Sequence, residues 1–257
     1  MINIDDFDSN RVWDAHAART YDPAEATGMF DPQLLAATGD RLIELTEGGR
    51  VLEFAIGTGR VAVPLWQRGV DVSGLELSPD MVEVLRTKAT EDEIPVTLGD
   101  MSTTRVEGEF SLVYLVFNTI SNLLTQAGQV QCFRNAAAHL RPGGRFVIEL
   151  WVPEVRSLTP GRSAVVFTDE TDGFTGPGYL GIDTFDLLNQ FVVSHHFHFG
   201  EGREATVGRS PHRFIWPSEL DLMAQLAGFE LEHRWADWTK AEFTAESPSH
   251  VSVYCLA

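Results

Sequence analysis

One short segment of the chain, residues 51–65, combines a carboxylate with two glycines at a spacing that suits ligand binding. Glu53 follows two apolar residues, and Gly57 and Gly59 stand four and six positions after it. Glycines that follow a strand let the backbone approach a bound ligand closely, because no Cβ intervenes. The segment therefore predicts a ligand site where a strand ends and a helix begins.

Two ligands are compatible with such a turn. The glycines and Ala62 match a loose dinucleotide fingerprint, and Glu76 follows at about the 20-residue distance that this fingerprint requires. In that fingerprint the diphosphate lies at the helix N-terminus, where a buried Glu53 would repel it. S-adenosylmethionine carries an ammonium and a sulfonium group, which the same carboxylate would attract. The charge of Glu53 thus favours S-adenosylmethionine.

Strand-like and helix-like segments alternate along the chain around this turn. Short apolar runs predict strands at 50–55, 71–77, 95–101, 110–118 and 145–152. Helical apolar spacing predicts helices at 32–45, 58–69, 79–89 and 128–140. Ser78 and Pro79 are typical of an N-cap and of the first position of the third helix. Near-continuous apolar runs are typical of parallel strands that helices cover on both faces. The alternation predicts an α/β fold with a doubly wound, mostly parallel sheet.

In a sheet of this kind, ligands bind at the carboxyl ends of the strands, which lie along one edge. The predicted strands place polar residues and the first glycine at that edge, namely Glu53, Gly57, Glu76, Asp100 and Asn118. The glycine turn is therefore expected to be one part of a larger site.

The pattern changes after Pro153. Residues 154–215 contain alternating apolar residues and a glycine-containing turn, which predict antiparallel strands inserted into the sheet. A capped helix at 216–229 and strands at 229–238 and 250–256 follow, which brings the sheet to seven strands. We therefore expect three parts. Residues 1–32 would form a helical N-terminal cap, residues 33–153 and 216–257 would form the sheet with its helices, and residues 154–215 would form an inserted antiparallel β lid.

Four motifs, in order along the chain, resemble those of class I S-adenosylmethionine-dependent methyltransferases. They are Glu53-Phe-Ala-Ile-Gly57-Thr-Gly59-Arg, Gly74-Leu-Glu76-Leu-Ser-Pro-Asp-Met81, Gly99-Asp100-Met101 and Leu140-Arg-Pro-Gly-Gly144. Four motifs at fitting distances are far more specific than any one of them. The resemblance covers residues 40–152 and the last strands, and it is to members that act on small molecules of the natural-product type. It implies a seven-stranded, Rossmann-like fold and methyl transfer.

The resemblance implies that S-adenosylmethionine binds along this edge of the sheet. Glu76 would accept hydrogen bonds from both ribose hydroxyls, Asp100 would accept one from the adenine amino group, and Glu53 would complement the positive charge directly or through water. Several residues could instead have a structural role. Glu76 could be a solvated acid at a strand end, Met81 could pack in the core of its helix, and Asp100 and Asn118 could stabilise turns. The other residues that the resemblance assigns to the cofactor are Ala55, Gly57, Thr58, Gly59, Arg60, Leu77, Met81, Gly99, Met101, Phe117 and Asn118.

The N-terminal segment and the insertion would cover this site. Residues 13–22 resemble an aromatic- and arginine-bearing helix that folds over the cofactor in small-molecule members of the family. Arg19 could pair with the methionine carboxylate, and Tyr21 or Trp13 could pack beside the methyl group. Alternatively, Arg19 could form a surface ion pair, and the two aromatic residues could belong to the core. Residues 154–215 resemble the antiparallel lid of natural-product N- and O-methyltransferases, which would supply much of the acceptor pocket.

A run of histidines, Ser194-His195-His196-Phe197-His198, falls within the insertion. On a strand, His196 and His198 share one face and His195 points to the other. Such a pair can bind zinc, with His212 or an acid as a further ligand, but no third ligand has clear spacing, so we expect no metal. The candidate catalytic residues, with ordinary pairing or exposure as the alternative, are His195, His196, His16 and Tyr21.

The chain has 257 residues, of which 37 are acidic and 19 are lysine or arginine, and its formal net charge is -18. This charge repels phosphate backbones and anionic lipids, so we expect neither a nucleic-acid nor a membrane partner. The sequence lacks a signal-like N-terminus and a spanning apolar run, and its two cysteines lack metal or disulfide spacing, so we expect a cytoplasmic protein. The lid strands could pair between two copies, which would give a homodimer.

These observations predict an enzyme that moves a methyl group from S-adenosylmethionine to nitrogen, oxygen or carbon of a small molecule by in-line displacement. The protein would align the acceptor with the sulfonium methyl group and exclude water. Three alternatives remain: an enzyme that cyclises or otherwise consumes the cofactor without methyl transfer, a non-catalytic cofactor-binding protein, and a dinucleotide-dependent dehydrogenase.

Overall fold

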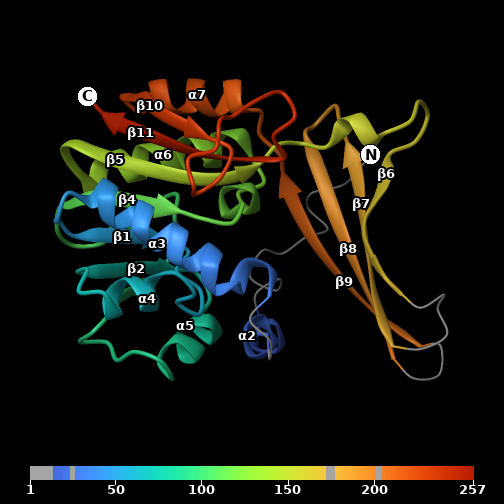
Figure 1. The fold of residues 1–257 in the computed structure, drawn as a ribbon, viewed down its shortest axis with the longest axis horizontal. Helices are drawn as coiled ribbons and strands as arrows, with labels where there is room; N and C mark the ends of the chain where they lie inside the picture. Colours follow the sequence, from blue (N-terminus) through green and yellow to red (C-terminus); the bar gives the residue numbers. More distant parts are fainter. Residues whose placement is uncertain (1–13, 24–26, 172–176, 201–203) are drawn as a thin grey trace.

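The computed structural model describes residues 14–23, 27–171, 177–200 and 204–257, which form two β-sheets (Figure 1). The larger sheet carries helices on both faces. The smaller, antiparallel sheet stands beside the end of the larger sheet toward which the arrow of β4 points in Figure 1.

The larger sheet has seven strands in the order β10-β11-β5-β4-β1-β2-β3. β1 pairs in parallel with both β2 and β4, whereas β11 runs antiparallel to β5 and to β10. The prediction of a doubly wound, mostly parallel seven-stranded sheet is therefore confirmed. Its strands are β1 (Val51–Phe54), β2 (Val72–Glu76), β3 (Val96–Leu98), β4 (Phe110–Leu115), β5 (Leu140–Trp151), β10 (Phe229–Trp235) and β11 (Ser249–Leu256).

Two predicted strand boundaries are wrong. The strand expected at 95–101 is limited to Val96–Leu98, and the strand expected at 145–152 already begins at Leu140. Leu140 pairs with Phe110, and the register then shifts before Leu112 pairs with Arg145. The motif expected to form the turn before the fifth strand is therefore an irregular part of that strand.

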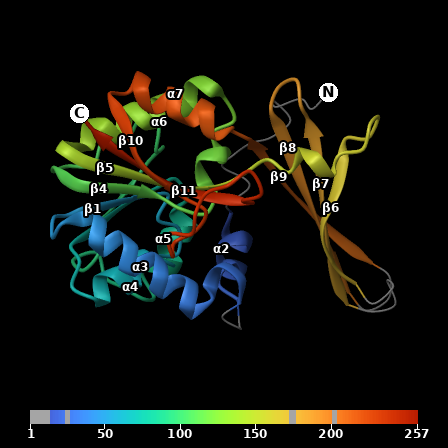
Figure 2. The ribbon, with the colours of Figure 1, turned by 45° about the horizontal axis from the view of Figure 1, so that its top comes forward.

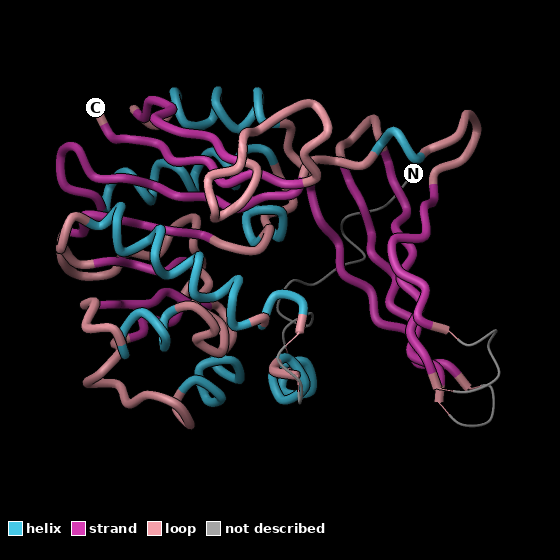
Figure 3. The backbone as a smooth tube through the Cα atoms, in the orientation of Figure 1, coloured by secondary structure: helices cyan, strands magenta, loops and turns pink. Residues whose placement is uncertain are grey.

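Helices pack on both faces of the larger sheet (Figure 3). Leu42 and Leu65, from α3 and α4, share one buried core with Val51, whereas Phe133 of α6 shares another with Phe54. Successive side chains of β1 point to opposite faces, so this strand contributes to both cores. No helix in the described part of the chain is long and apolar enough to cross a bilayer. The helices are α3 (Pro32–Thr46), α4 (Ala62–Gln67), α5 (Pro79–Leu85), α6 (Gln126–His139) and α7 (Pro217–Leu226), with the short 3-10 turns η3 (Thr119–Asn122) and η4 (Val155–Ser157).

The second sheet, which we call the lid, has four antiparallel strands in the order β6-β7-β8-β9. They are β6 (Ala164–Glu170), β7 (Gly178–Asp186), β8 (Phe191–Phe199) and β9 (Ala205–Arg213). This arrangement confirms the antiparallel insertion. Residues 14–23 and 27–31, which we call the arm, contain α2 (Ala15–Tyr21) and η2 (Gly28–Phe30). In Figures 1 and 2, α2 lies between the larger sheet with its helices and the lid.

A buried arginine joins the lid to the helices of the larger sheet. Arg213, at the end of β9, donates hydrogen bonds to Gln129 of α6 at 2.6 Å and to Glu219 of α7 at 2.7 Å. Gln190, between β7 and β8, donates to the other carboxylate oxygen of Glu219 at 2.7 Å and accepts from Arg213 at 3.1 Å. Because its members satisfy one another, this network fixes the lid at one end.

Replacing Arg213 by methionine keeps most of the side-chain volume but leaves Glu219 without its cation. We expect the variant Arg213→Met to lose about 3 kcal/mol of unfolding free energy, because the remaining charge stays largely buried. Urea denaturation measures this loss. The control is Arg156→Met, since the ion pair of Arg156 with Glu246 is mostly exposed and is worth less than about 1 kcal/mol. Equal losses in both variants would contradict the anchoring role.

Candidate active site

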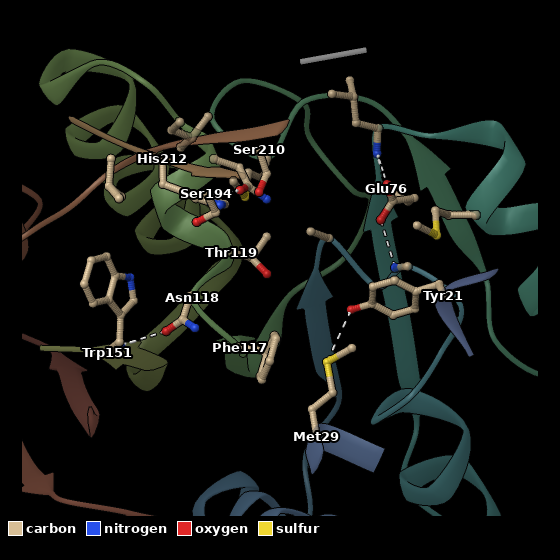
Figure 4. A pocket seen from close by; sticks show the side chains of 18 of the residues that line it. Tyr21, Met29, Glu76, Phe117, Asn118, Thr119, Trp151, Ser194, Ser210 and His212 are labelled. Carbon is tan, nitrogen blue, oxygen red and sulfur yellow. Dashed lines mark hydrogen bonds between the residues drawn. The ribbon is translucent and has the colours of Figure 1, made fainter. Parts of the chain in front are cut away.

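A cavity of about 650 Å3 lies at the carboxyl ends of the parallel strands, between the larger sheet, the arm and the lid (Figure 4). Its volume is typical of small-molecule sites. The structure brings most of the predicted cofactor residues to its wall, namely Tyr21, Ala55, Gly57, Glu76, Leu77, Met81, Gly99, Asp100, Met101, Phe117 and Asn118. Glu53, Thr58, Gly59 and Arg60 are not part of this wall.

The turn after β1 requires its two glycines for different reasons. Gly57 and Gly59 have φ values of 57° and 81°, in the left-handed region that favours glycine. A Cβ at Gly59 would lie 2.3 Å from Leu85, so the missing side chain lets the end of α5 pack against the turn. A Cβ at Gly57 would meet no atom closer than 3.9 Å, so its requirement is conformational. Ala55 adopts a similar φ of 52° with a side chain, at a cost of about 1 kcal/mol.

Glu76, at the end of β2, holds two turns together. Its carboxylate accepts hydrogen bonds from the backbone amides of Gly57 at 2.8 Å, Leu77 at 2.9 Å and Ser78 at 2.8 Å. Burial raises the pKa of this carboxyl, and the three amides act in the opposite direction. A carboxylate offers about four acceptor positions. About one acceptor position of the carboxylate therefore remains for a ligand.

Glu53 lies beneath the cavity wall. Its side chain is 3% exposed and accepts a hydrogen bond from the hydroxyl of Tyr114 on β4 at 2.8 Å. Burial raises the pKa of Glu53 to about 8, although the Tyr114 hydroxyl and the nearby Arg60 lower it. The carboxyl is therefore mostly protonated at neutral pH. The sequence argument assumed a charged carboxylate here, and attraction of a cation would require this group to lose its proton.

Asp100 and Met101 form the turn after β3. One oxygen of Asp100 accepts hydrogen bonds from the amide and the hydroxyl of Ser102, both at 2.6 Å, so the residue does stabilise the turn. Within the described residues its other oxygen has no hydrogen-bond partner, and Asp100 lines the cavity. Met81 is 3% exposed, yet it also borders the cavity, so it is both helix core and wall.

The turn after β4 projects Phe117 and Asn118 into the centre of the cavity (Figure 4). Both residues have positive φ, 52° and 64°, which is a strained conformation for residues with side chains. Glu149 on β5 stabilises it, because its carboxylate and its carbonyl accept from the amides of Phe117 and Asn118 at 2.8 and 3.1 Å. The side-chain oxygen of Asn118 accepts from the Trp151 amide at 2.7 Å, which leaves its NH2 group as the donor toward a ligand.

Among the described N-terminal candidates, Tyr21 alone lines the cavity. Its ring packs edge-on against Phe30 with centroids 5.8 Å apart, and burial raises the pKa of its hydroxyl. His16 and Arg19 lie on the exposed side of α2 and do not reach the wall. Trp13 lies outside the described residues. Met29, which the sequence did not single out, borders the cavity beside Tyr21.

The lid presents a polar face to the cavity, opposite Tyr21 and Glu76 (Figure 4). Ser194 of β8 is paired in register with Asp183 of β7 and with Ser210 of β9, so these three side chains form one row. Ser194 donates a hydrogen bond to Asp183 at 2.6 Å. His196 and His212 lie in the neighbouring rows of the same face.

The histidines of the lid differ in position. His195 points to the other face and does not line the cavity. His196 does line it, but its two ring nitrogens are within 2.7 Å of the Tyr179 hydroxyl and 3.0 Å of the Ser210 hydroxyl. Burial lowers the pKa of His196, and it lowers that of His212 to about 4, so both rings are mostly neutral at neutral pH. In the described chain no three His, Cys, Asp or Glu residues are grouped to hold a metal ion.

Sequence reasoning missed several residues of this site. Asp183, Ser194 and Ser210 were not candidates, and His212 appeared only as a possible zinc ligand. The alternation rule that put His196 and His198 on one face would also have placed Ser194 there. It could not reach Asp183 and Ser210, because cross-strand register depends on pairing that the sequence does not display.

Comparison with known proteins agrees with this geometry. A family model described as a methyltransferase domain matches residues 51–144. The structure of the CcbJ methyltransferase from Streptomyces caelestis superposes with a TM-score of 0.84; it is 33% identical, and the match covers 98% of this chain and 100% of that one. The chain belongs to the class I S-adenosylmethionine-dependent methyltransferases. The predicted family, reaction class and cofactor are thereby confirmed, and the dehydrogenase and non-enzyme alternatives are set aside.

Other relatives of this methyltransferase cover less sequence or are more distant. A putative methyltransferase, YqeM of Bacillus subtilis (strain 168), is 25% identical over 206 residues, which are 79% of this chain and 82% of that protein. CalS10 of Micromonospora echinaspora, an amino pentose methyltransferase solved with S-adenosylmethionine bound, has a TM-score of 0.68 at 19% identity, with 95% of each chain covered. At that identity the likeness concerns the fold.

The buried carboxyl of Glu53 gives the methyltransferase a defined pH dependence. The folded protein holds this proton up to a pKa of about 8, whereas the unfolded chain releases it near 4.5, so stability falls as pH rises between these values. We expect Glu53→Gln to gain unfolding free energy relative to the unchanged protein from pH 5 to 8, by up to about 1.4 kcal/mol per pH unit. Urea denaturation at several pH values measures the difference.

The control for this comparison is the exposed substitution Glu230→Gln on β10. It should show no such trend, because Glu230 is not taken out of water on folding. A stability difference for Glu53→Gln that stays constant over this pH range would contradict the protonated state.

Proposed function

We propose that this methyltransferase transfers the methyl group to an amine nitrogen of a small molecule that binds between the lid and the cofactor. The observation that carries this proposal is Asp183. Among the described residues of the lid that line the cavity, it is the one carboxylate. An amine is the acceptor that a carboxylate in this place would select, because it arrives as an ammonium ion.

The surroundings of Asp183 support a cationic acceptor. Burial raises the pKa of its carboxyl, although the hydrogen bond from Ser194 lowers it, and a carboxylate with a raised pKa is a stronger proton acceptor. The rings of His196 and His212 are kept neutral by burial and do not repel a cation. The Nε2 atom of His212 and the Ser194 and Ser210 hydroxyls can bind hydroxyl groups of the same molecule.

In this mechanism the ammonium group of the acceptor binds near Asp183 and transfers one proton to the Asp183 carboxylate, so that the nitrogen gains a free lone pair. The nitrogen then attacks the methyl carbon while the carbon–sulfur bond breaks, and its electron pair stays on sulfur. S-adenosylhomocysteine and a methylated ammonium product result. The protein contributes alignment and removal of water.

We further propose that the residues on the opposite wall hold the cofactor. Glu76 would contact the ribose, Asp100 and Met101 the adenine, and Gly57 and Asn118 the methionine part. Relatives named as N,N-dimethyltransferases of dTDP-linked amino sugars support an amine acceptor. One of these, from Streptomyces fradiae, is 35% identical over 115 residues, 44% of each chain.

The proposed function is tested with S-adenosylmethionine that carries a labelled methyl group. Small molecules are offered in pairs that differ only in an amine or a hydroxyl, beginning with dTDP-linked amino sugars and their hydroxy counterparts. We expect the label on the nitrogen of the amine member. Label on oxygen or carbon would contradict the proposal, and cofactor consumed without a labelled acceptor would indicate cyclisation.

Asp183→Asn should lower kcat/KM for the amine acceptor by about 100-fold or more, because the variant can neither attract the ammonium ion nor take its proton. Binding of S-adenosylhomocysteine, measured by calorimetry, should be unchanged, since Asp183 belongs to the lid. The matched control is Asp169→Asn on β6, which removes the same charge from an exposed part of the lid. A kcat/KM for Asp183→Asn equal to that of the control would overturn the assignment.

A further inference from the structure

We propose that Asp22 is a positioning residue of the cofactor site, which fastens the arm to the glycine turn and thereby holds Tyr21 and Met29 in the cavity wall. This inference goes beyond the proposed amine methylation, because it concerns the cofactor and holds for any acceptor. It rests on a set of contacts between three segments that are distant in sequence.

Asp22 joins the arm to the glycine turn and to the segment after α5. One of its carboxylate oxygens accepts a hydrogen bond from the hydroxyl of Thr58 at 2.7 Å, and the other forms an ion pair with Lys88. Lys88 also donates to the backbone carbonyl of Thr58 at 2.8 Å. Thr58 is fully buried, and the side chains of Asp22 and Lys88 are each 30% exposed. We call these three residues the clasp.

The clasp acts directly on the turn that borders the cofactor site. Thr58 stands between Gly57 and Gly59, and the clasp binds both its hydroxyl and its carbonyl. The neighbouring amide of Gly57 is the one that meets Glu76. The same contacts therefore fix the arm and the position of the turn.

A second attachment lies at the other end of the arm. Arg60 donates a hydrogen bond to the carbonyl of Met29 at 2.8 Å. Its guanidinium lies 5.8 Å from the ring centroid of Phe30 and 5.3 Å from that of Phe117, so it joins the arm to the turn after β4. Both residues of the arm that line the cavity are therefore held in place. Tyr21 is followed by Asp22, which binds Thr58, and the carbonyl of Met29 binds Arg60.

The arm is held differently from the lid. The lid is anchored through the buried Arg213, whose side chain is 7% exposed, whereas the clasp reaches solvent. A partly exposed ion pair contributes little to overall stability. Its loss should loosen α2 while the two sheets stay folded, and Tyr21 would then lose its fixed place in the wall opposite the lid (Figure 4).

The test uses the full chain and S-adenosylhomocysteine as the probe, with affinity measured by calorimetry. The variants are Asp22→Asn, Thr58→Val and the double substitution. We expect each single change to weaken binding about 10-fold or more, and the double change to weaken it by less than the product of the two, because both break one contact. The control is Asp40→Asn on α3, which removes the same charge from an exposed ion pair with Arg68.

Two further measurements separate positioning from general destabilisation. Thermal unfolding without ligand should stay within a few degrees of the unchanged protein, and hydrogen exchange should rise at the amides of α2 but not in β1 or β4. Asp22→Glu, which keeps the charge, should recover part of the affinity. Binding by Asp22→Asn and Thr58→Val equal to that of the control, or independent effects in the double variant, would overturn the proposal.

Discussion

The cavity wall at the ends of β1 and β2 depends on one buried carboxylate that holds three backbone amides. Glu76 accepts from Gly57 in the turn after β1 and from Leu77 and Ser78 in the turn after β2. These turns lie at the carboxyl ends of neighbouring parallel strands, and nothing in strand pairing alone would fix one relative to the other. Because an unpaired buried carboxylate is costly, the three bonds are held strongly. The start of α5 and the position of the glycine turn both follow from this interaction.

The fold could be predicted because buried parallel strands leave a strong signal in the sequence. The apolar runs around Val51, Leu75 and Val113 are buried on both faces, and Ser78 and Pro79 mark a helix start that the structure confirms. The boundaries of β3 and β5 were wrong because pairing with a neighbour, rather than composition, decides where an irregular strand begins. The cavity wall on the side of the larger sheet could be predicted from local motifs, since each of its residues lies close to the end of its own strand.

The remaining parts of the site depend on contacts between segments that are far apart in sequence. Asp183 lies in the cavity wall because β7 pairs with β8 so that Asp183 is opposite Ser194. Glu149 stabilises the turn at Phe117 through a hydrogen bond. No local sequence pattern predicts either contact. Protonation states belong to the same class. Glu53 was taken as a charged group, but its pKa is raised to about 8 because the fold removes it from water. Burial also lowers the pKa of His196 and His212, which the spacing of the histidines in the sequence could not indicate.

In the lid, the side chains that face the cavity are different from the groups that hold the strands together. Side chains at positions 183, 194, 210 and 212 face the cavity, while the backbone ladder and the outward-facing residues between them hold the strands together. These four positions can therefore be exchanged during evolution with little effect on the ladder, as long as the glycine turn is retained. A gene duplicate could acquire a new acceptor through a few such exchanges, because the larger sheet and its glycine turn would not need to change.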